Sequence, residues 1–181
     1  MNALKFTPFP TLLTERLTLR KFSAGDKKNV FIFRSDDRIM KYIKRPKQQH
    51  PDEASAFISM INNGIEENKW INWVITLTET SQFIGTICLW KFAEGNTVAE
   101  VGYALHPDFQ GKGIMTEALN CVIAYGFDSL KLKSVDAYTN RNNAKSIALL
   151  ERKGFIHQPE KTDEGNLENA IYILYNPSGT T

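Results

Sequence analysis

The sequence predicts an α/β fold of the α+β type: one domain with a mixed, largely antiparallel sheet of six to seven strands flanked by helices. The chain has 181 residues, which suits one domain with a sizeable core. Segments with strand and helix periodicity follow one another without a repeat, a low-complexity tract or a linker. Three strand candidates in the middle are separated only by short turns, which is typical of an antiparallel meander.

The N-terminal part predicts one strand followed by helices. Polar and apolar side chains alternate from Arg16 onward, as in a half-buried strand. Ser23 suits an N-cap, and Pro51 suits the first turn of a helix. The expected elements are a strand at 16–22, a helix that begins at 23, a short helix at 36–43 and a helix from 51 to about 64.

The remainder of the chain predicts most of the sheet and two further helices. Gly85 lies inside a strand candidate and indicates a bulge or a close approach of two backbones. Gly154 suits the residue that follows a helix end. The expected strands are 70–78, 83–92, 97–105, 134–139, 155–157 and 170–175, and the expected helices are one that follows the loop 106–113 and one at 143–153.

Composition is that of an ordinary globular protein, with 42% apolar and 23% charged residues. A net charge of +2 gives little support for direct nucleic-acid binding. Cys88 and Cys121 lie in apolar segments without metal-ligand spacing, so we expect reduced thiols and no metal. Residues 1–10 hold no signal-peptide core, and no run reaches the ~20 apolar residues of a membrane span. We therefore expect a cytoplasmic protein that does not enter a membrane.

Residues 100–119 carry the strongest functional signal. A strand candidate ends at Pro107, a short loop holds Gln110-Gly-Lys-Gly113, and a helical pattern follows. A glycine loop at a helix start offers backbone N–H groups and the helix dipole to an anionic ligand. A P-loop is excluded because no glycine opens the required pattern, and a dinucleotide fingerprint is excluded because residue 116 is Thr. Two glycines that only shape a turn remain the alternative.

The segment Gln110-Gly-Lys-Gly113-Ile-Met115 resembles motif A of the GCN5-related N-acetyltransferase (GNAT) superfamily, Arg/Gln-x-x-Gly-x-Gly/Ala. The lead-in from Glu100 to Tyr103 resembles the branch that contains the RimJ/RimL ribosomal-protein N-terminal acetyltransferases. Asn143–Phe155 resembles the second block of that branch, and Thr14–Arg20 resembles its first strand. The resemblance covers residues 12 to 175, so it implies that the chain, 1–181, is a single N-acetyltransferase domain.

The resemblance implies acetyl-CoA as the cosubstrate, bound where the sheet splays beside the loop. In this family the pyrophosphate lies on backbone N–H groups of the loop and helix start, where glycines permit a close approach. Met115 replaces a small residue, so its side chain must point into the core. Asn143 reaches the pantetheine arm or only caps its helix. The implied cofactor-binding residues are Leu105, Gln110, Gly111, Lys112, Gly113, Ile114, Met115 and Asn143.

Acetyl transfer to an amine needs a base for the amine and a donor for the departing thiolate. Glu100 is the candidate base, since burial at the splayed site would raise its pKa; an exposed Glu paired with a Lys is the alternative. The resemblance implies Ser146 as the donor, because the Tyr of many members is here Leu150. The alternative is that Ser146 only stabilises the start of its helix. Neither cysteine has a candidate base beside it in sequence, which favours direct transfer.

The branch resemblance implies that the acceptor amine is a protein N-terminus, as in ribosomal-protein acetylation. A small amine such as a polyamine, an amino acid or an aminoglycoside is one alternative, and a non-catalytic acyl-CoA-binding module is another. The presence of Glu100 argues against the second. Four aromatic residues could wall an acceptor pocket, although aromatic residues in strands more often form core: Trp70, Trp73, Trp90 and Tyr103. A monomer and a homodimer are both compatible with the sequence.

Overall fold

The structure is a computed structural model that describes residues 3–178; residues 1–2 and 179–181, at the ends of the expected domain, lie outside the described part. One sheet of eight strands forms the centre of this part, in the order β1-β2-β3-β4-β5-β6-β8-β7. The pair β5–β6 is parallel, and the six other pairs are antiparallel. The prediction of a mixed, largely antiparallel sheet is confirmed.

The elements follow the predicted order along the chain. The strands are β1 (Leu12–Leu13), β2 (Leu17–Arg20), β3 (Ile71–Leu77), β4 (Phe83–Ala93), β5 (Val98–Leu105), β6 (Ser134–Asn140), β7 (Ile156–His157) and β8 (Asn169–Tyr175). The α-helices are α1 (Lys27–Ser35), α2 (Asp37–Met40), α3 (Pro51–Glu66), α4 (Ile114–Ala124) and α5 (Ala144–Arg152). A π-helical turn, Tyr125–Ser129, extends α4.

Several elements differ from the sequence prediction, and α2, expected at 36–43, ends at Met40. β1 adds an eighth strand, and its two residues are too few to show a period. Helix α3 continues to Glu66 instead of ending near Gly64. A Cβ at Gly64 would lie 2.1 Å from the Trp70 ring, so this glycine is required by packing and not by a helix end. The close approach predicted at Gly85 is confirmed, because a Cβ there would lie 2.5 Å from the Ala104 carbonyl oxygen.

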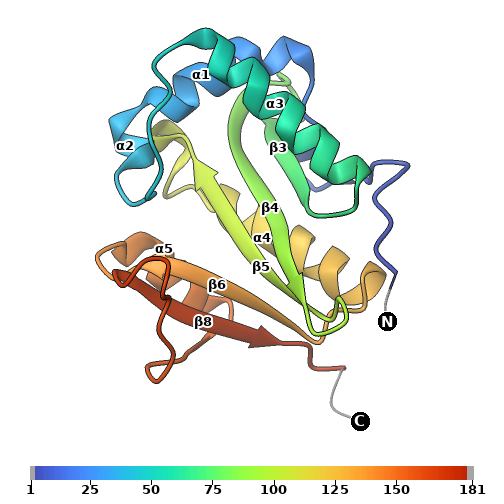
Figure 1. Ribbon diagram of the computed structural model, residues 1–181, viewed down its shortest axis with the longest axis vertical. Coiled ribbons are helices and arrows are strands. Elements are labelled where there is room, and N and C mark those ends of the chain that lie inside the picture. The colour runs from blue at the N-terminus through green and yellow to red at the C-terminus, as the bar shows by residue number, and fades with distance from the viewer. Residues whose placement is uncertain (1–2, 179–181) are drawn as a thin grey trace.

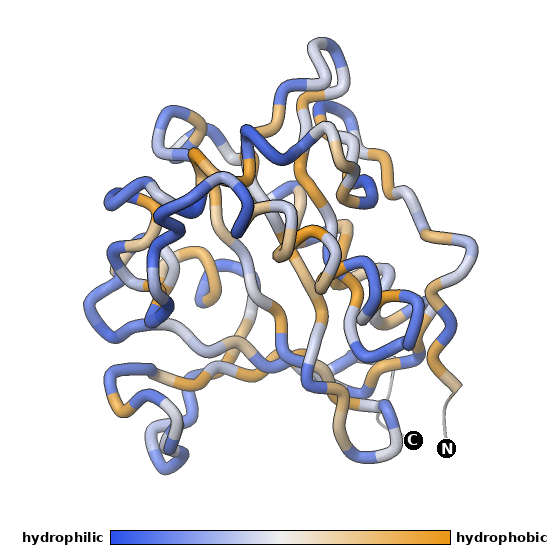
Figure 2. The backbone as a smooth tube through the Cα atoms, turned by 45° about the horizontal axis from the view of Figure 1, so that its top comes forward, coloured by the Kyte–Doolittle hydropathy of each residue, from blue (hydrophilic) through white to orange (hydrophobic). Residues whose placement is uncertain are grey.

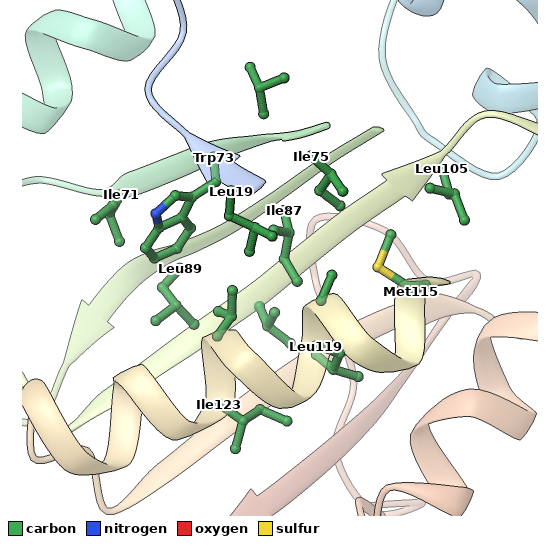
Figure 3. Close-up of a cluster of buried hydrophobic side chains, with 14 of the residues drawn as sticks. Leu19, Ile71, Trp73, Ile75, Ile87, Leu89, Leu105, Met115, Leu119 and Ile123 are labelled. Atoms are coloured by element: carbon green, nitrogen blue, oxygen red, sulfur yellow. The ribbon is translucent and has the colours of Figure 1, made fainter. Parts of the chain in front are cut away.

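Helices cover both faces of the sheet. Figure 1 shows α1 and α3 on the near face and α4 behind β4 and β5. Successive strand residues point to opposite faces, so Trp73 and Leu89 lie on the α4 side, where both are fully buried. Figure 3 shows them packed with Leu119 and Ile123 of α4. Figure 2 shows that the outer loops are mainly hydrophilic, which leaves the apolar residues to the space between sheet and helices.

The strands β5 and β6 separate half-way along their length. Their parallel pairing joins only Val98–Val101 to Ser134–Ala137. β5 continues to Leu105 and β6 to Asn140, and Figure 1 shows the two strands diverging. The loop before α4 follows β5, and the start of α5 follows β6. The carboxyl ends of two neighbouring parallel strands therefore open towards a site between them, the usual ligand position in open α/β sheets.

Candidate active site

The loop before α4 exposes backbone amides. Gly111 and Gly113 both have φ of +74°, in the left-handed region that glycine occupies without a Cβ penalty. Gly113 is the N-cap of α4. The first N–H groups of a helix have no partner within the helix, so those of Ile114 and Met115 can face an anion. No heavy atom lies within 4 Å of the place that a Cβ of Gly111 would take, so the loop is open to a ligand there.

The side chain of Glu117 fixes this loop to the turn between β1 and β2. Its Oε1 accepts from the Arg16 amide at 2.9 Å and from the Thr14 hydroxyl, and its Oε2 pairs with Arg16 Nε at 2.7 Å. Arg16 Nη1 also donates to the Lys112 carbonyl oxygen at 3.0 Å. Burial works against the charge of Glu117, but these donors hold its pKa below the usual range. Sequence reasoning missed this contact, although both segments belong to blocks that it had singled out.

Gln110 connects the end of β5 to the head of α5. Its Nε2 donates to the Leu105 carbonyl oxygen at 3.1 Å, and its Oε1 accepts from Lys145 Nζ at 3.0 Å. The side chain therefore spans the two sides of the splayed region. Both contacts of the Gln110 side chain are with protein groups, as expected for a residue that positions the loop.

A cleft of about 1360 Å³ runs along the splayed strands. Ligand pockets for small molecules measure roughly 300–1,000 Å³, so this cleft has room for a large cosubstrate together with an acceptor. The predicted residues on its wall are Glu100, Leu105, Gln110, Gly111, Gly113, Ile114, Met115, Asn143 and Ser146. Lys112 lies outside this wall, and its Nζ stands 5.6 Å from the centre of the Phe109 ring.

Glu100 lines the cleft from β5. Its side chain is 10% exposed, and its Oε2 accepts from Lys91 Nζ at 2.8 Å. Burial raises the pKa of Glu100 above its ordinary value, and Lys91 opposes this rise without cancelling it. The sequence left a buried base and an exposed, lysine-paired Glu as alternatives; the structure shows a carboxylate that is lysine-paired and buried. A buried carboxylate with a raised pKa in a cleft has the properties of a general base.

Ser146 contacts a tyrosine that sequence reasoning had placed only as a possible pocket wall. Its Oγ lies 2.9 Å from the Tyr103 hydroxyl oxygen, a contact that links α5 to β5. Burial raises the pKa of Tyr103 to about 12, so this hydroxyl stays protonated. The Ser146 amide donates to Asn143 Oδ1 at 3.2 Å, and Asn143 is thus the N-cap of α5. A tyrosine hydroxyl therefore lies beside Ser146, although residue 150 is Leu.

The side chains of Met115 and Leu105 belong to the core. Both side chains are buried. Figure 3 shows them with the apolar cluster between β5 and α4. The predicted inward orientation of Met115 is confirmed, and its amide remains at the helix start.

The other aromatic and sulfur groups divide between cleft and core. Trp90 lines the cleft together with Tyr103. Trp73 is fully buried, and Trp70 Nε1 donates to the Ile61 carbonyl oxygen at 3.0 Å. Cys88 lines the cleft as well, and burial raises the pKa of its thiol to about 11. Because the thiolate is the reactive form, Cys88 is a poor nucleophile at neutral pH.

The described part of the chain, residues 3–178, holds neither a metal-binding cluster nor a membrane-spanning helix. Within this range, no group of three or more His, Cys, Asp or Glu side chains could hold a metal ion. Across the same described residues, no helix has the length and the apolar character needed to cross a bilayer. A smaller cavity of about 380 Å³ lies beside β8 near His157 and Tyr172, and none of the predicted site residues lines it.

Comparison with known proteins identifies the family. The family profile of the acetyltransferase (GNAT) domain matches residues 16–156. The uncharacterized N-acetyltransferase YoaA of Bacillus subtilis (strain 168) is 31% identical over 172 residues, which cover 95% of this chain and 94% of YoaA. The uncharacterized N-acetyltransferase p20 of Bacillus licheniformis is 35% identical over 156 residues, with 83% and 88% of the two chains covered.

Solved structures agree with this match. The ribosomal-protein-S5-alanine acetyltransferase of Vibrio fischeri superposes with a TM-score of 0.77 at 21% identity, over 95% of this chain and all of that one. The fold expected from the RimJ/RimL resemblance is thereby confirmed. The splayed strands and the open glycine loop fit acetyl-CoA, the cosubstrate of this family. The chain belongs to the GNAT family and is an acetyl-CoA-dependent N-acetyltransferase.

Proposed function

We propose that this acetyltransferase transfers the acetyl group of acetyl-CoA directly to the α-amine of a protein N-terminus, in a ternary complex. One observation carries the proposal: a single cleft brings Glu100 and the Ser146–Tyr103 pair together beside the glycine loop. A base and a hydroxyl donor at one anion-binding loop are the groups that acyl transfer to an amine requires.

The loop residues have distinct parts in cosubstrate binding. The amides from Gly111 to Met115 bind the pyrophosphate, favoured by the dipole of α4. The edge of β5 up to Leu105 pairs with the amides of the pantetheine arm, as an added strand would. Gln110 and Asn143 position these groups, because Gln110 already binds the Leu105 carbonyl and Asn143 already caps α5. Lys112 contributes its backbone. Bound acetyl-CoA supplies the activated thioester.

Glu100 removes a proton from the amine as the new bond forms. The nitrogen bonds to the acetyl carbon, Glu100 accepts the proton that the nitrogen loses, and the bond between carbon and sulfur breaks. An α-amine with a pKa near 8 is already about a tenth neutral at pH 7, whereas a lysine amine near 10.4 is less than about a thousandth neutral. A carboxylate base therefore suffices more readily for an α-amine than for lysine.

Ser146 and Tyr103 stabilise the departing thiolate. Glu100 and Tyr103 are three residues apart on β5, so their side chains leave the strand on opposite faces. The amine and the leaving sulfur are thus served from different sides of the reacting bond. A thiol has a pKa of about 8.5, well below the value of about 12 for Tyr103. The hydroxyl pair therefore acts by hydrogen bonding rather than by giving up its proton.

Direct transfer is favoured over an acetyl-enzyme. Cys88 is the cysteine that lines the cleft, and its thiol has a pKa of about 11. At pH 7 such a thiol is almost entirely protonated and thus a weak nucleophile. A direct mechanism also needs no second covalent step, because Glu100 can serve the acceptor amine itself.

The proposed acceptor, a protein N-terminus, is favoured by the family resemblance, while the relatives include acetyltransferases of proteins and of small amines. YdaF of Bacillus subtilis, described as a candidate ribosomal N-acetyltransferase, is 27% identical over 91% of this chain and 88% of its own. A spermidine N(1)-acetyltransferase of Vibrio cholerae is 25% identical over 89% of this chain and 87% of its own. The motifs from Glu100 to Tyr103 and from Asn143 to Phe155 favour the first kind.

A thiol-release assay tests the proposal. Acetyl-CoA is incubated with the full chain and with N-terminal peptides, free amino acids, spermidine or aminoglycosides, and free CoA is measured. We expect peptide-dependent thiol release, with the acetyl group on the peptide α-amine by mass spectrometry. Release with small amines alone contradicts the peptide acceptor. Detection of an acetylated enzyme that forms without an amine contradicts direct transfer.

A further inference from the structure

Two arginines on the wall of the cleft have no anionic partner. Arg34 of α1 and Arg45, in the segment after α2, both line the cleft. Neither forms an ion pair with a described carboxylate, and Arg34 Nε is buried without a hydrogen-bond partner in the described part of the chain. A buried guanidinium nitrogen without a partner costs free energy, so the site is incomplete as it stands.

The two other arginines between residues 20 and 45 have carboxylate partners, which Arg34 and Arg45 lack among the described residues. Arg20 binds Asp26 through two nitrogens, and Arg38 binds Asp36. Arg34 instead lies with its Cζ 4.0 Å from the centre of the Phe57 ring. Burial, and then the positive charge of Arg45, lower the pKa of Arg34. Two like charges are therefore held close together by packing and lack the anion that would offset their repulsion.

The position of the pair separates it from the pyrophosphate loop. Phe57 belongs to α3, which covers the opposite face of the sheet from α4, as Figure 1 shows. Arg45 lies with its Cζ 5.8 Å from the centre of the Trp90 ring. Trp90 is paired with Glu100 in the register of β4 and β5. The arginines thus lie on the same face as the base, with one indole ring between Arg45 and Glu100, and away from the head of α4.

We propose that Arg34 and Arg45 bind a carboxylate or phosphate of the acceptor, so that the preferred substrate is a primary amine with an anionic group close to it. This inference rests on the proposed function and narrows its acceptor. A guanidinium can donate two parallel hydrogen bonds to a carboxylate or phosphate, which fixes orientation as well as charge. The same pair repels an oligocationic acceptor such as spermidine, because neither arginine is paired with a described carboxylate.

Paired acceptors that differ only in the anion test this inference. The acceptors are C-terminally amidated tetrapeptides with Asp or Asn at the second position, alanine or alaninamide, O-phosphoethanolamine or ethanolamine, and spermidine. For the unmodified chain we expect kcat/KM about 10–100-fold higher for the anionic member of at least one pair, the range of one or two charged hydrogen bonds. The pair with the largest ratio identifies whether a side-chain carboxylate, an α-carboxylate or a phosphate is the source of the anion.

Substitutions assign the preference to the two arginines. Arg45→Gln and Arg34→Gln should each lower kcat/KM for the anionic acceptor about 10-fold, leave the neutral partner within about 2-fold, and leave KM for acetyl-CoA unchanged. Lys28→Gln removes one charge from an exposed position of α1 and should change none of these values. Arg45 is exposed, so its substitution avoids the folding risk at Arg34; Arg45→Glu should also raise turnover of spermidine.

The possible results separate this inference from the proposed function. Equal kcat/KM for anionic and neutral acceptors overturns the inference and leaves the acetyltransfer mechanism standing. An equal loss for both members of a pair in Arg45→Gln overturns it too. A rise in KM for acetyl-CoA in the same variant would assign the arginines to the cosubstrate instead, which overturns it as well. Absence of thiol release with every amine contradicts the proposed function and this inference together.

Discussion

Two glutamates in two regions of the molecule have pKa values that are shifted in opposite directions. At the head of α4, Glu117 accepts from the Thr14 hydroxyl and from both the amide and the guanidinium of Arg16, which hold its pKa below the usual range. On the cleft floor, Glu100 has one lysine partner, and burial raises its pKa. The first carboxylate is saturated with donors, and the second retains the capacity to accept a proton.

The comparison distinguishes a scaffold from a reaction site. The carboxylate of Glu117 accepts hydrogen bonds from Thr14 and Arg16 and thereby positions the loop. Its lowered pKa makes it a poor proton acceptor at neutral pH. In the cleft, burial raises the pKa of Glu100 although Lys91 and Trp90 both hydrogen-bond to it, and Arg34 has no anionic partner among the described residues. Perturbed groups of this second kind mark functional sites. Substitutions at the two regions should therefore affect different measurements.

The largest effect is expected at Glu100. Glu100→Gln keeps the shape of the side chain and removes the proposed base, so kcat should fall by about 10²–10⁴-fold while the dissociation constant of acetyl-CoA stays unchanged. Steady-state thiol release and calorimetric titration with CoA measure the two quantities. Unchanged turnover would show that Glu100 is only a partner of Lys91.

The pH profile supplies a second readout at Glu100. Glu100 must be ionised to accept a proton, so activity should rise with pH through its pKa. Since this pKa is raised above the ordinary 4.5, the acid limb of kcat/KM, calculated on the concentration of neutral amine, should lie above pH 4.5 and should be missing from the residual activity of Glu100→Gln. An acid limb that persists in the variant would belong to another group.

The next effect is expected at the hydroxyl pair. Ser146→Ala removes the hydroxyl that we propose faces the leaving sulfur, and it should lower kcat about 10–100-fold. Tyr103→Phe leaves Ser146 in place and should cost less, about 10-fold, with little change in KM for acetyl-CoA. Single-turnover thiol release measures both rates. A Ser146→Ala enzyme with normal kcat would restrict Ser146 to the start of α5.

Glu117→Gln should affect stability and acetyl-CoA binding more than kcat, the reverse of what we expect for Glu100→Gln. The variant loses the charge that three donors from two residues share, so the free energy of unfolding should fall by about 1–3 kcal/mol and KM for acetyl-CoA should rise, with kcat little changed. Thermal melts and initial rates measure this. Because the pKa of Glu117 is lowered, its stabilisation is present above its ordinary 4.5 and is lost as pH falls through the folded value. A melting temperature equal to that of the unmodified chain would remove Glu117 from the scaffold.

The smallest effect is expected at the loop glycines, where the chain provides its own control. Gly111 has φ of +74° and Gly95, in the turn between β4 and β5, has φ of +69°; neither has a heavy atom within 4 Å of its Cβ position. Gly111→Ala and Gly95→Ala should thus lose similar stability, about 1 kcal/mol. KM for acetyl-CoA should rise several-fold only in Gly111→Ala. Equal KM values in the two variants would show that the loop does not approach the pyrophosphate.

Local patterns predicted much of this protein. The strand meander and the helix starts follow from periodicity and capping residues, and the glycine loop follows from a motif in consecutive residues. Even the inward side chain of Met115 was predictable, because an apolar residue in the first turn of an amphipathic helix has a core to face. These features depend on neighbours within one or two turns of chain.

The remaining features depend on contacts between distant segments. Tyr103 and Ser146, which are in contact, lie 43 residues apart in the sequence, and Arg16 and Glu117 lie 101 residues apart. Neither distance leaves a periodic trace in the sequence. The unpaired state of Arg34 is harder still to predict, because it requires knowing that no described carboxylate reaches its Nε. Sequence identified the right blocks, and only the fold showed which side chains of those blocks touch.

The incomplete pairing of β5 with β6 has a consequence for the behaviour of the folded protein. Beyond Val101 and Ala137 the centre of the sheet presents two strand edges, and such edges invite pairing with other extended chains. A ligand that covers them also stabilises the fold by mass action, by about 2.7 kcal/mol at 100 times its dissociation constant. Because we propose that acetyl-CoA pairs with the edge of β5, we expect it to raise the free energy of unfolding and the resistance of the enzyme to aggregation.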